Sequence, residues 1–293
     1  MFPERGCGSR YRRRVLPLAD VSVCIPVHRG EDVLAETIGS VLDQTYRDFE
    51  IVVLDNASPD RSGMVARAAG DPRIRVERTA TVLPEAECWN RAVQLSRAPL
   101  VKLLCADDLL HPRCLEFQVA AMDADPGLAV VASRRHLIDE ESRVRVPRRG
   151  LSGLTGMRTG VEVARRVVRQ GGNPIGEPAD VLFRREDFFA AGGWRADRSH
   201  ILDLDLWMRL LQYGEFLGLP EPLAAVRVIG RPASGDDAER RADQRAALMD
   251  ELGDSTLFQV RGIDRTVGRL LSPVNRTRRR VLSAVSGAKR VPA

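Results

Sequence analysis

The sequence predicts an α/β protein in which a mainly parallel sheet is covered by helices on both faces. Three observations favour this fold class. Short, continuously apolar segments alternate with segments whose apolar residues recur at helical spacing. The connections between them are short and rich in turn-forming residues. The apolar segments also lack the polar alternation of half-exposed strands, which is typical of parallel strands buried on both faces.

The first half of the chain shows this alternation most clearly. Buried strands are expected at residues 21–27, 49–55, 74–79 and 99–105. Helices are expected at residues 31–45, 62–70, 85–96 and 111–122. Each predicted strand is thus followed by a predicted helix, which is the order that builds a parallel sheet.

After residue 130 the alternation is weaker. The expected elements are a strand at 128–133, a polar glycine-rich loop at 143–156, a helix at 160–170, a strand and a short helix within 179–194, a helix at 201–214 and a strand at 223–229. A charged helix is expected from about 231, followed by a basic helix interrupted at Pro273. Residues 1–18 are expected to form a disordered basic tail.

The composition is that of a globular protein with a modest positive charge. The 293 residues are 44% hydrophobic and 29% charged, with a net charge of +5 and a pI of about 9.2. This basicity suits an anionic ligand, a nucleic acid or an acidic membrane surface, and does not choose between them. Five cysteines without CxxC or zinc-type spacing indicate reduced thiols in a cytoplasmic protein. Neither a signal peptide nor an apolar run of about 18 residues is found, so no transmembrane helix is expected.

Polar residues follow three of the predicted strands, at the places where parallel sheets bind ligands. The three clusters are Pro26-Val27-His28, Asp55-Asn56 and Asp107-Asp108. A carboxylate such as Asp55 at a strand end can bind hydroxyl or base NH groups of a ligand. The alternative is that this segment only begins the next helix, with Ser58 or Asp60 as its cap.

Two pairs of aspartates suggest chemistry. Asp107 and Asp108 repel each other unless a cation neutralises them, and hard oxygen ligands suit Mg²⁺ or Mn²⁺. The alternative is a solvated turn with a helix cap. Asp203 and Asp205 begin a predicted helix, where they project about 200° apart around its axis. They can face a cleft from different sides, or simply complement the helix dipole.

Taken in order, these segments resemble glycosyltransferase family 2, a group of inverting sugar transferases with the GT-A fold. The resemblance covers about residues 20–230 and is carried by residues 21–60, 89–108, 173–194 and 202–210. It implies a GT-A-type, Rossmann-like, mostly parallel sheet over 19–230, with a nucleotide-sugar-binding half at 19–130 and an acceptor half at 131–230. A charged and basic helical extension at 231–293 follows.

The resemblance also implies roles for individual residues. Asp203 matches the general base, and Asp107 matches the residue that holds the metal and the diphosphate, with Asp108 as a further metal ligand. The nucleotide-sugar side is expected to include Pro26, Val27, His28, Asp55, Asn56 and Asn90. The acceptor side is expected to include Glu177, Pro178, Asp205 and Trp207. The chain departs from the family pattern at Cys105, where the first aspartate of the D-x-D motif is usual.

The function implied is inverting transfer of a sugar from a nucleoside diphosphate, UDP or dTDP, to a hydroxyl of a glycan, a lipid-linked or a small-molecule acceptor. A divalent metal, Mn²⁺ or Mg²⁺, is the expected cofactor. Cell-wall or exopolysaccharide biosynthesis is the expected setting, in the cytoplasm. In the basic C-terminus, Val260, Ile263, Val267, Leu270, Leu271 and Val274 recur among arginines, which predicts peripheral contact with the inner membrane face. The alternative is a helix packed on the domain with a solvated basic face.

Three other functions were weighed. A non-catalytic sugar-nucleotide-binding protein is favoured by Cys105 and opposed by the presence of Asp203. A nicotinamide-dependent oxidoreductase is opposed by the lack of a G-x-G-x-x-G fingerprint after Val27. A nucleic-acid-binding protein rests on the basic termini alone, and no nucleic-acid partner is expected.

Overall fold

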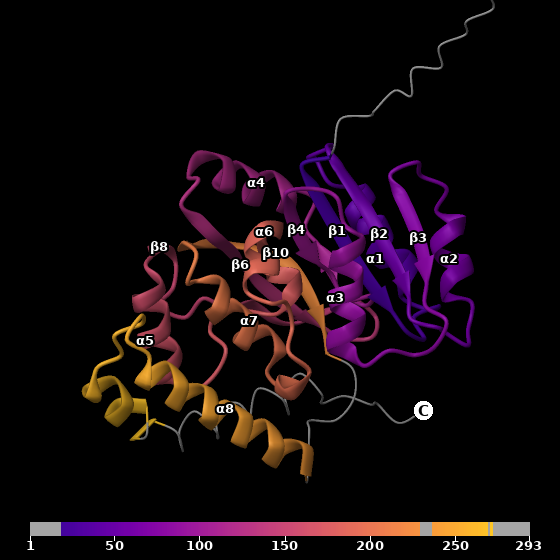
Figure 1. Ribbon diagram of the computed structural model, residues 1–293. Helices are drawn as coiled ribbons and strands as arrows, with labels where there is room; N and C mark the ends of the chain where they lie inside the picture. The colour runs from indigo at the N-terminus through magenta and orange to yellow at the C-terminus, as the bar shows by residue number, and fades with distance from the viewer. Residues whose placement is uncertain (1–18, 229–235, 269, 272–293) are drawn as a thin grey trace, which may run out of the picture.

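A computed structural model describes residues 19–228, 236–268 and 270–271 of the chain (Figure 1). The described residues contain a ten-stranded sheet, whose main path runs β3-β2-β1-β4-β9-β6-β10-β5. The predicted basic tail at 1–18 and the predicted helix break at Pro273 lie outside the described residues.

The first half of the chain forms the parallel part of the sheet, as predicted. Its strands are β1 (Val21–Val27), β2 (Phe49–Asp55), β3 (Ile74–Arg78) and β4 (Leu100–Leu103). Its helices are α1 (Leu34–Leu42), α2 (Ser62–Ala68), α3 (Glu85–Leu95) and α4 (Cys114–Ala124). β1 pairs in parallel with both β2 and β4, and β2 with β3, so that Val27 lies beside Asp55 at one edge of the sheet.

The second half of the chain adds a mixed sheet. Its strands are β5 (Leu109–Leu110), β6 (Leu128–Ile138), β7 (Val144–Arg149), β8 (Gly156–Arg158), β9 (Val181–Arg184) and β10 (Glu215–Arg227). β9 lies antiparallel between β4 and β6, whereas β6 and β10 are parallel. The sheet is therefore parallel on one side and mixed on the other.

Two predictions for this half were wrong in part. The segment 143–156 was expected to be a loop, yet its Val144–Arg149 part pairs with β6. The arginines of this segment are not typical of a strand, so the sequence did not indicate β7, which pairs with β6. β10 begins at Glu215, well before the predicted strand at 223–229, because bulges next to Pro222 accommodate residues that usually interrupt strands.

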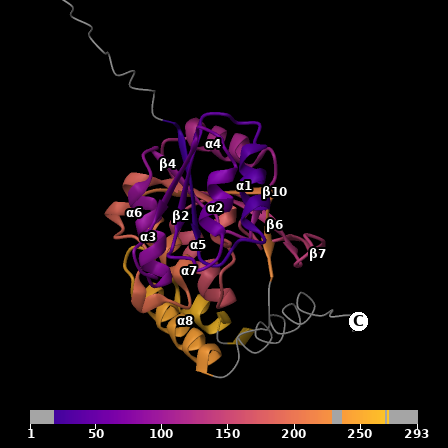
Figure 2. The same cartoon turned by 90° about the vertical axis from the view of Figure 1, so that its right-hand side faces the viewer.

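Helices cover the sheet on two faces, each with its own apolar core. Apart from η1 (Pro178–Asp180) and η2 (Ala196–Arg198), the helical elements of this half include α5 (Gly160–Gln170), α6 (Arg185–Ala190), α7 (Leu202–Leu210) and α8 (Asp236–Asp254), and residues 262–268 are helical as well. One core contains side chains of α1, α2 and α4, and the other contains those of α3, α5, α6, α7 and the last turns of α8. Figure 2 shows α3 and α6 on one side of the strands and α1 on the other. Among the described helices, none has the length and apolar character needed to span a membrane.

Candidate active site

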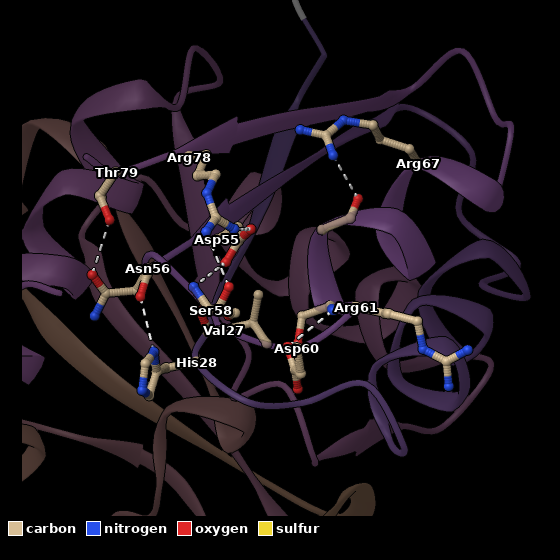
Figure 3. A network of polar contacts seen from close by, with 12 residues as sticks. Val27, His28, Asp55, Asn56, Ser58, Asp60, Arg61, Arg67, Arg78 and Thr79 are labelled. Atoms are coloured by element: carbon tan, nitrogen blue, oxygen red, sulfur yellow. Dashed lines mark hydrogen bonds and ion pairs between the residues drawn. The ribbon is translucent and has the colours of Figure 1, made fainter. Parts of the chain in front are cut away.

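Hydrogen bonds and ion pairs connect side chains at the edge where β1 and β2 end (Figure 3). Pro26 and Val27 are buried, and His28 is the first exposed residue after β1. The Nδ1 atom of His28 lies 2.9 Å from the Asn56 carbonyl oxygen. The Asn56 side chain donates to the Leu83 carbonyl oxygen and accepts from the Leu83 amide, at 2.9 and 2.8 Å. Asn56 thus fixes the loop before α3, and His28 is the group left open to a ligand.

Asp55 is completely buried and already has a counter-charge. Its carboxylate forms an ion pair with Arg78, and its Oδ1 accepts a hydrogen bond from the Ser58 amide at 2.9 Å. The pairing of β2 with β3 sets Arg78 beside Asp55, so the contact follows from strand register. The Arg78 side chain is 47% exposed, and it is therefore the charged group of this pair that meets solvent. The sequence prediction did not include Arg78.

A cavity of about 410 Å³ lies between the end of β4, the start of α3, the loop before η1, the start of α7 and α8. It brings together five of the predicted residues, which are Asp107, Asp108, Glu177, Pro178 and Asp203. The carboxylates that line it are Glu85, Asp107, Asp108, Glu177 and Asp203, and the basic residues are His200, Arg227, Arg241 and Arg245. Residues more than 100 positions apart in sequence thus form one polar pocket.

Asp107 and Asp108 lie on the wall formed after β4. Burial raises the pKa of both carboxyl groups, and the neighbouring Asp107 raises that of Asp108 further. Arg227 at the end of β10 opposes this: its amide donates to Asp108 Oδ1 at 2.9 Å and its Nε to the Asp107 carbonyl oxygen at 3.0 Å. The raised pKa values show that the negative charge here is under-compensated, which fits a cation between these carboxylates and an anionic ligand.

The residues present offer a bound metal few protein ligands. Cys105, at the usual D-x-D position, lines the same pocket, and burial raises the pKa of its thiol well above the usual value, with Asp108 and Asp107 adding to the effect. Within the described residues, no group of three or more His, Cys, Asp or Glu side chains is arranged to hold a metal ion. A divalent cation would therefore be coordinated by the Asp107 carboxylate, with Asp108 next to it. Oxygen atoms of the substrate and of water would be its other ligands.

Asp203 lies in the first turn of α7 and faces the pocket. Its Oδ1 is buried and has no hydrogen-bond partner within the described residues. Burial raises the pKa of Asp203 well above its usual value, and the adjacent Glu177 carboxyl raises it further. A buried carboxylate without a counter-charge and with a raised pKa is suited to accept a proton near neutral pH.

Two side chains from other elements hold the loop that carries Glu177. Arg135 of β6 binds Glu177 at 3.2 Å and Asp180 at 2.6 Å. Trp207 of α7 donates from Nε1 to the Gly176 carbonyl oxygen at 3.0 Å. Gly176 has a φ of +145°, and a Cβ there would lie 2.1 Å from Asp180 Oδ2, so only glycine fits this approach.

Eight predicted residues do not line this cavity. Pro26, Val27, His28, Asp55 and Asn56 lie where β1 and β2 end, and the other three are Asp205, Trp207 and Asn90. Asp205, expected on the acceptor side, is buried and binds Arg195 and Arg209, because its place on α7 points it away from Asp203. Trp207 was expected there too but lies in the core, where it positions the loop through Gly176. Asn90, expected beside the nucleotide, is bound to the amide and carbonyl of Trp194, both at 2.8 Å.

Besides Arg227, the sequence prediction missed four ionisable residues of the pocket, Glu85, His200, Arg241 and Arg245. Glu85 begins α3, and burial raises the pKa of its carboxyl, an effect that Arg241 and His200 partly offset. The one sequence signal for the arginines is their helical spacing with Leu248 and Leu252 on α8. That spacing predicts a shared face, but not what the face covers.

Comparison with known proteins gives a family for this chain. Residues 22–189 match the family described as Glycosyl transferase family 2. The succinoglycan biosynthesis protein ExoU of Rhizobium meliloti is 31% identical over 207 residues, which cover 67% of this chain and 58% of ExoU. The chain therefore spans less than two thirds of that relative.

Two solved structures share the fold. S. aureus TarS in complex with UDP-GlcNAc aligns with a TM-score of 0.61 at 16% identity, covering 81% of this chain and 73% of TarS. The mannosyltransferase PcManGT from Pyrobaculum calidifontis, in complex with GDP-Man and Mn²⁺, aligns with a TM-score of 0.59 at 18% identity, covering 93% and 76%. The predicted α/β fold class, with a mostly parallel sheet between helices, is confirmed.

Proposed function

Because the chain belongs to glycosyl transferase family 2, we propose that it is an inverting transferase that moves a sugar from a nucleoside diphosphate to an acceptor hydroxyl group. The observation that carries this proposal is Asp203, which shares one cavity with Asp107 and Asp108 and has a carboxylate oxygen without a hydrogen-bond partner in the part of the chain that the structure describes. Asp203 removes the proton from the acceptor hydroxyl as its oxygen attacks the anomeric carbon. The bond from that carbon to the diphosphate breaks, and the nucleoside diphosphate leaves from the opposite face.

The environment of Asp203 suits a base. Its pKa is raised by burial and by Glu177, so the proton affinity of its carboxylate is higher than that of an exposed aspartate. Arg135 binds Glu177 at 3.2 Å and keeps this neighbour in place. General-base assistance of this kind contributes roughly 10²–10⁴-fold to the rate.

We propose Mn²⁺ or Mg²⁺ as the cofactor, held by Asp107 with Asp108 behind it. When bound, the metal supplies positive charge to the leaving diphosphate. The related fold of PcManGT was solved with GDP-Man and Mn²⁺, which supports this choice. Asp107→Ala should abolish Mn²⁺ binding in calorimetry, and full transfer activity in the presence of a chelator would remove the metal from the proposal.

The donor half is proposed to be residues 19–130 and the acceptor half 131–230. The nucleoside would lie at the edge formed by Pro26–His28 and Asp55–Asn56, where Arg78 and His28 are the side chains open to solvent. UDP or dTDP is the proposed nucleotide, and the UDP-GlcNAc complex of TarS supports UDP. The acceptor would be a glycan, a lipid-linked or a small-molecule hydroxyl, and the exopolysaccharide setting is supported by the name of ExoU.

A donor panel tests the proposed function. The full chain is incubated with UDP-, dTDP- and GDP-sugars and Mn²⁺, and release of the nucleoside diphosphate is measured without an acceptor. At least one donor should be hydrolysed slowly, and Asp107→Ala should abolish this. If the protein neither binds nor cleaves any of these donors, the proposed function is wrong.

Peripheral contact with an acidic membrane is proposed for the basic C-terminus, where Leu270 and Leu271 are 72% and 42% exposed, together with the side of α5 that it meets. Arg165, Arg166 and Arg169 lie on α5, and Leu257 and Ile263 nearby are 50% and 63% exposed. Asp264 is fully buried and pairs with Arg169, so a truncation before it would damage the fold. The full chain and a chain ending at Leu271 should therefore be compared by co-sedimentation with vesicles containing phosphatidylglycerol. Binding by neither chain would refute the membrane contact.

A further inference from the structure

The face of helix α8 that packs against the protein is basic in one part and apolar in the next. Its residues Arg241, Arg245, Leu248 and Leu252 follow one another at helical spacing and therefore share one face. Leu248 and Leu252 are buried in the apolar core at 3% exposure each. Arg245, about one turn before Leu248, and Arg241, about two turns before it, line the active-site cavity instead. The helix thus carries leucines where it meets the core and arginines where it passes the pocket.

The position of α8 over the pocket is fixed by several contacts. Gln244 accepts a hydrogen bond from the His200 amide at 3.0 Å and donates one to the Asp197 carbonyl oxygen at 3.0 Å. Glu251 forms an ion pair with Arg198. The three partners, Asp197, Arg198 and His200, belong to the segment that leads directly into α7 and Asp203. The arginines are therefore held in register with the proposed base.

The basic residues of the pocket act on different carboxylates. Arg227 contacts Asp108 and Asp107, on the side proposed for the metal and the diphosphate, through its amide at 2.9 Å and its Nε at 3.0 Å. Arg241, together with His200, lowers the raised pKa of Glu85 at the start of α3. The Arg227 guanidinium also donates hydrogen bonds to the Asp139 and Glu140 carbonyl oxygens and to the Glu36 carboxylate. The charge supplied by α8 therefore lies at a different part of the cavity from that supplied by β10.

We propose that Arg241 and Arg245 bind a phosphate group carried by the acceptor, which makes this transferase selective for phosphorylated acceptors. This inference rests on the proposed function and names its substrate class. Side chains four residues apart on a helix lie about 5–6 Å apart at Cβ, so two guanidinium groups can converge on one phosphate. Guanidinium groups pair with phosphate through two parallel hydrogen bonds, which gives both affinity and orientation. A phosphate held there would bring a neighbouring hydroxyl of the same acceptor to the cavity that contains Asp203.

The same arginines could instead bind the diphosphate of the donor, and calorimetry separates the two sources. The probes are UDP with Mn²⁺ for the donor, and glucose 1-phosphate and glucose for the acceptor, titrated with and without saturating UDP and Mn²⁺. The test protein carries Arg241→Gln and Arg245→Gln together. The control carries Arg240→Gln, which removes an equal charge from an exposed position next to Arg241 that does not line the cavity.

The wild type and the control should bind glucose 1-phosphate more tightly than glucose. The double variant should lose at least about tenfold in affinity for glucose 1-phosphate, as expected for lost hydrogen bonds to a charged group. All three proteins should bind UDP within about twofold of one another. A variant with lysines at both positions should keep part of the phosphate affinity, which separates lost charge from a displaced helix.

Two results would overturn this inference without touching the proposed function. One is equal or absent binding of glucose 1-phosphate in wild type and double variant while UDP still binds. The other is a loss of UDP affinity in the double variant, which would assign the arginines to the donor diphosphate. Failure of the proposed function looks different, because then neither UDP binding nor donor hydrolysis is found in the wild type, while titration of glucose 1-phosphate without UDP still tests the arginine pair.

Discussion

The two sides of α7 carry the same residue type in opposite surroundings. Asp205 is buried between Arg195 and Arg209, which neutralise its carboxylate. Asp203, two residues earlier, faces the cavity, lies against Glu177 and has a buried oxygen with no hydrogen-bond partner among the described residues. Both are acids in the first turn of one helix, where the dipole favours them equally. Their roles are therefore decided by residues from other parts of the chain.

The difference teaches how to separate a structural acid from a chemical one. A buried carboxylate with two guanidinium partners contributes to stability only while those partners stay paired. A buried carboxylate without such partners costs stability, and its raised pKa is the measure of that cost. Such a cost is typical of functional sites.

Removing the charge of Asp203 should have the largest effect. Asp203→Asn keeps the shape of the side chain but removes the proton acceptor, so the transfer rate should fall by roughly 10²–10⁴-fold. The melting temperature at pH 7 should stay the same or rise, because an amide avoids the burial of an under-compensated charge. Steady-state transfer and thermal melts measure both, and near-normal transfer by a folded protein would defeat the assignment of the base.

The same substitution at Asp205 should invert the outcome. Asp205→Asn leaves Arg195 and Arg209 without a buried counter-charge, which should cost about 3–5 kcal/mol of unfolding free energy. Below its melting temperature the variant should retain most of its transfer activity, since Asp205 does not line the cavity. Urea unfolding measures the loss, with Asp197→Asn as control, because Asp197 is 72% exposed. A loss of activity as large as that of Asp203→Asn would contradict this division of roles.

The pH dependence should report the raised pKa of Asp203. Transfer requires its deprotonated form, so the rate should fall by up to about tenfold per pH unit below its folded pKa, which lies well above 3.8. Since the folded pKa is raised, the stability linked to this group is present at low pH and is lost as pH rises through that value. Rate profiles and melts between pH 4.5 and 8 should show both trends. The stability trend should be weaker in Asp203→Asn, and an unchanged trend would point to another carboxyl.

Loosening the loop that carries Glu177 should have the smallest effect. Trp207→Phe keeps the core packed but leaves the buried Gly176 carbonyl without its donor, which should cost about 1–3 kcal/mol of unfolding free energy. Transfer should fall only several-fold, with nucleotide affinity unchanged. Trp194→Phe is the matched control, because the buried Trp194 Nε1 has no hydrogen-bond partner within the described residues. Equal effects of the two substitutions would refute the positioning role of Trp207.

The sequence predicted the parallel half of the fold well, because each of its strands is a continuous apolar run. It predicted less of the mixed half. There, arginines in β7 and prolines in the first part of β10 are not typical of strands. In the site, the resemblance pointed to Asp107, Asp108 and Asp203, which share one cavity. Their chemical roles stay proposals.

The remaining site features depend on contacts that no short motif contains. Asn90 and Asp205 lie within the segments that carry the resemblance, yet their side chains bind the protein itself. Arg78 meets Asp55 through strand register, and Arg241 reaches the pocket because α8 packs there through leucines. Pairing across a sheet and docking of a distant helix are set by tertiary packing, which local spacing does not reveal.

The contacts of Arg227 determine when the pocket is completed during synthesis of the chain. Arg227 binds Asp108 and Asp107 from positions 119 and 120 residues later in the sequence. Its strand, β10, lies between β6 and β5 inside the sheet. During synthesis the half of the chain that contains Asp107 and Asp108 leaves the ribosome first, but the aspartate pair lacks these contacts until β10 has been made and inserted into the sheet. A partly synthesised chain that ends before β10 therefore has an unfinished pocket, in which Asp107 and Asp108 lack their contacts with Arg227.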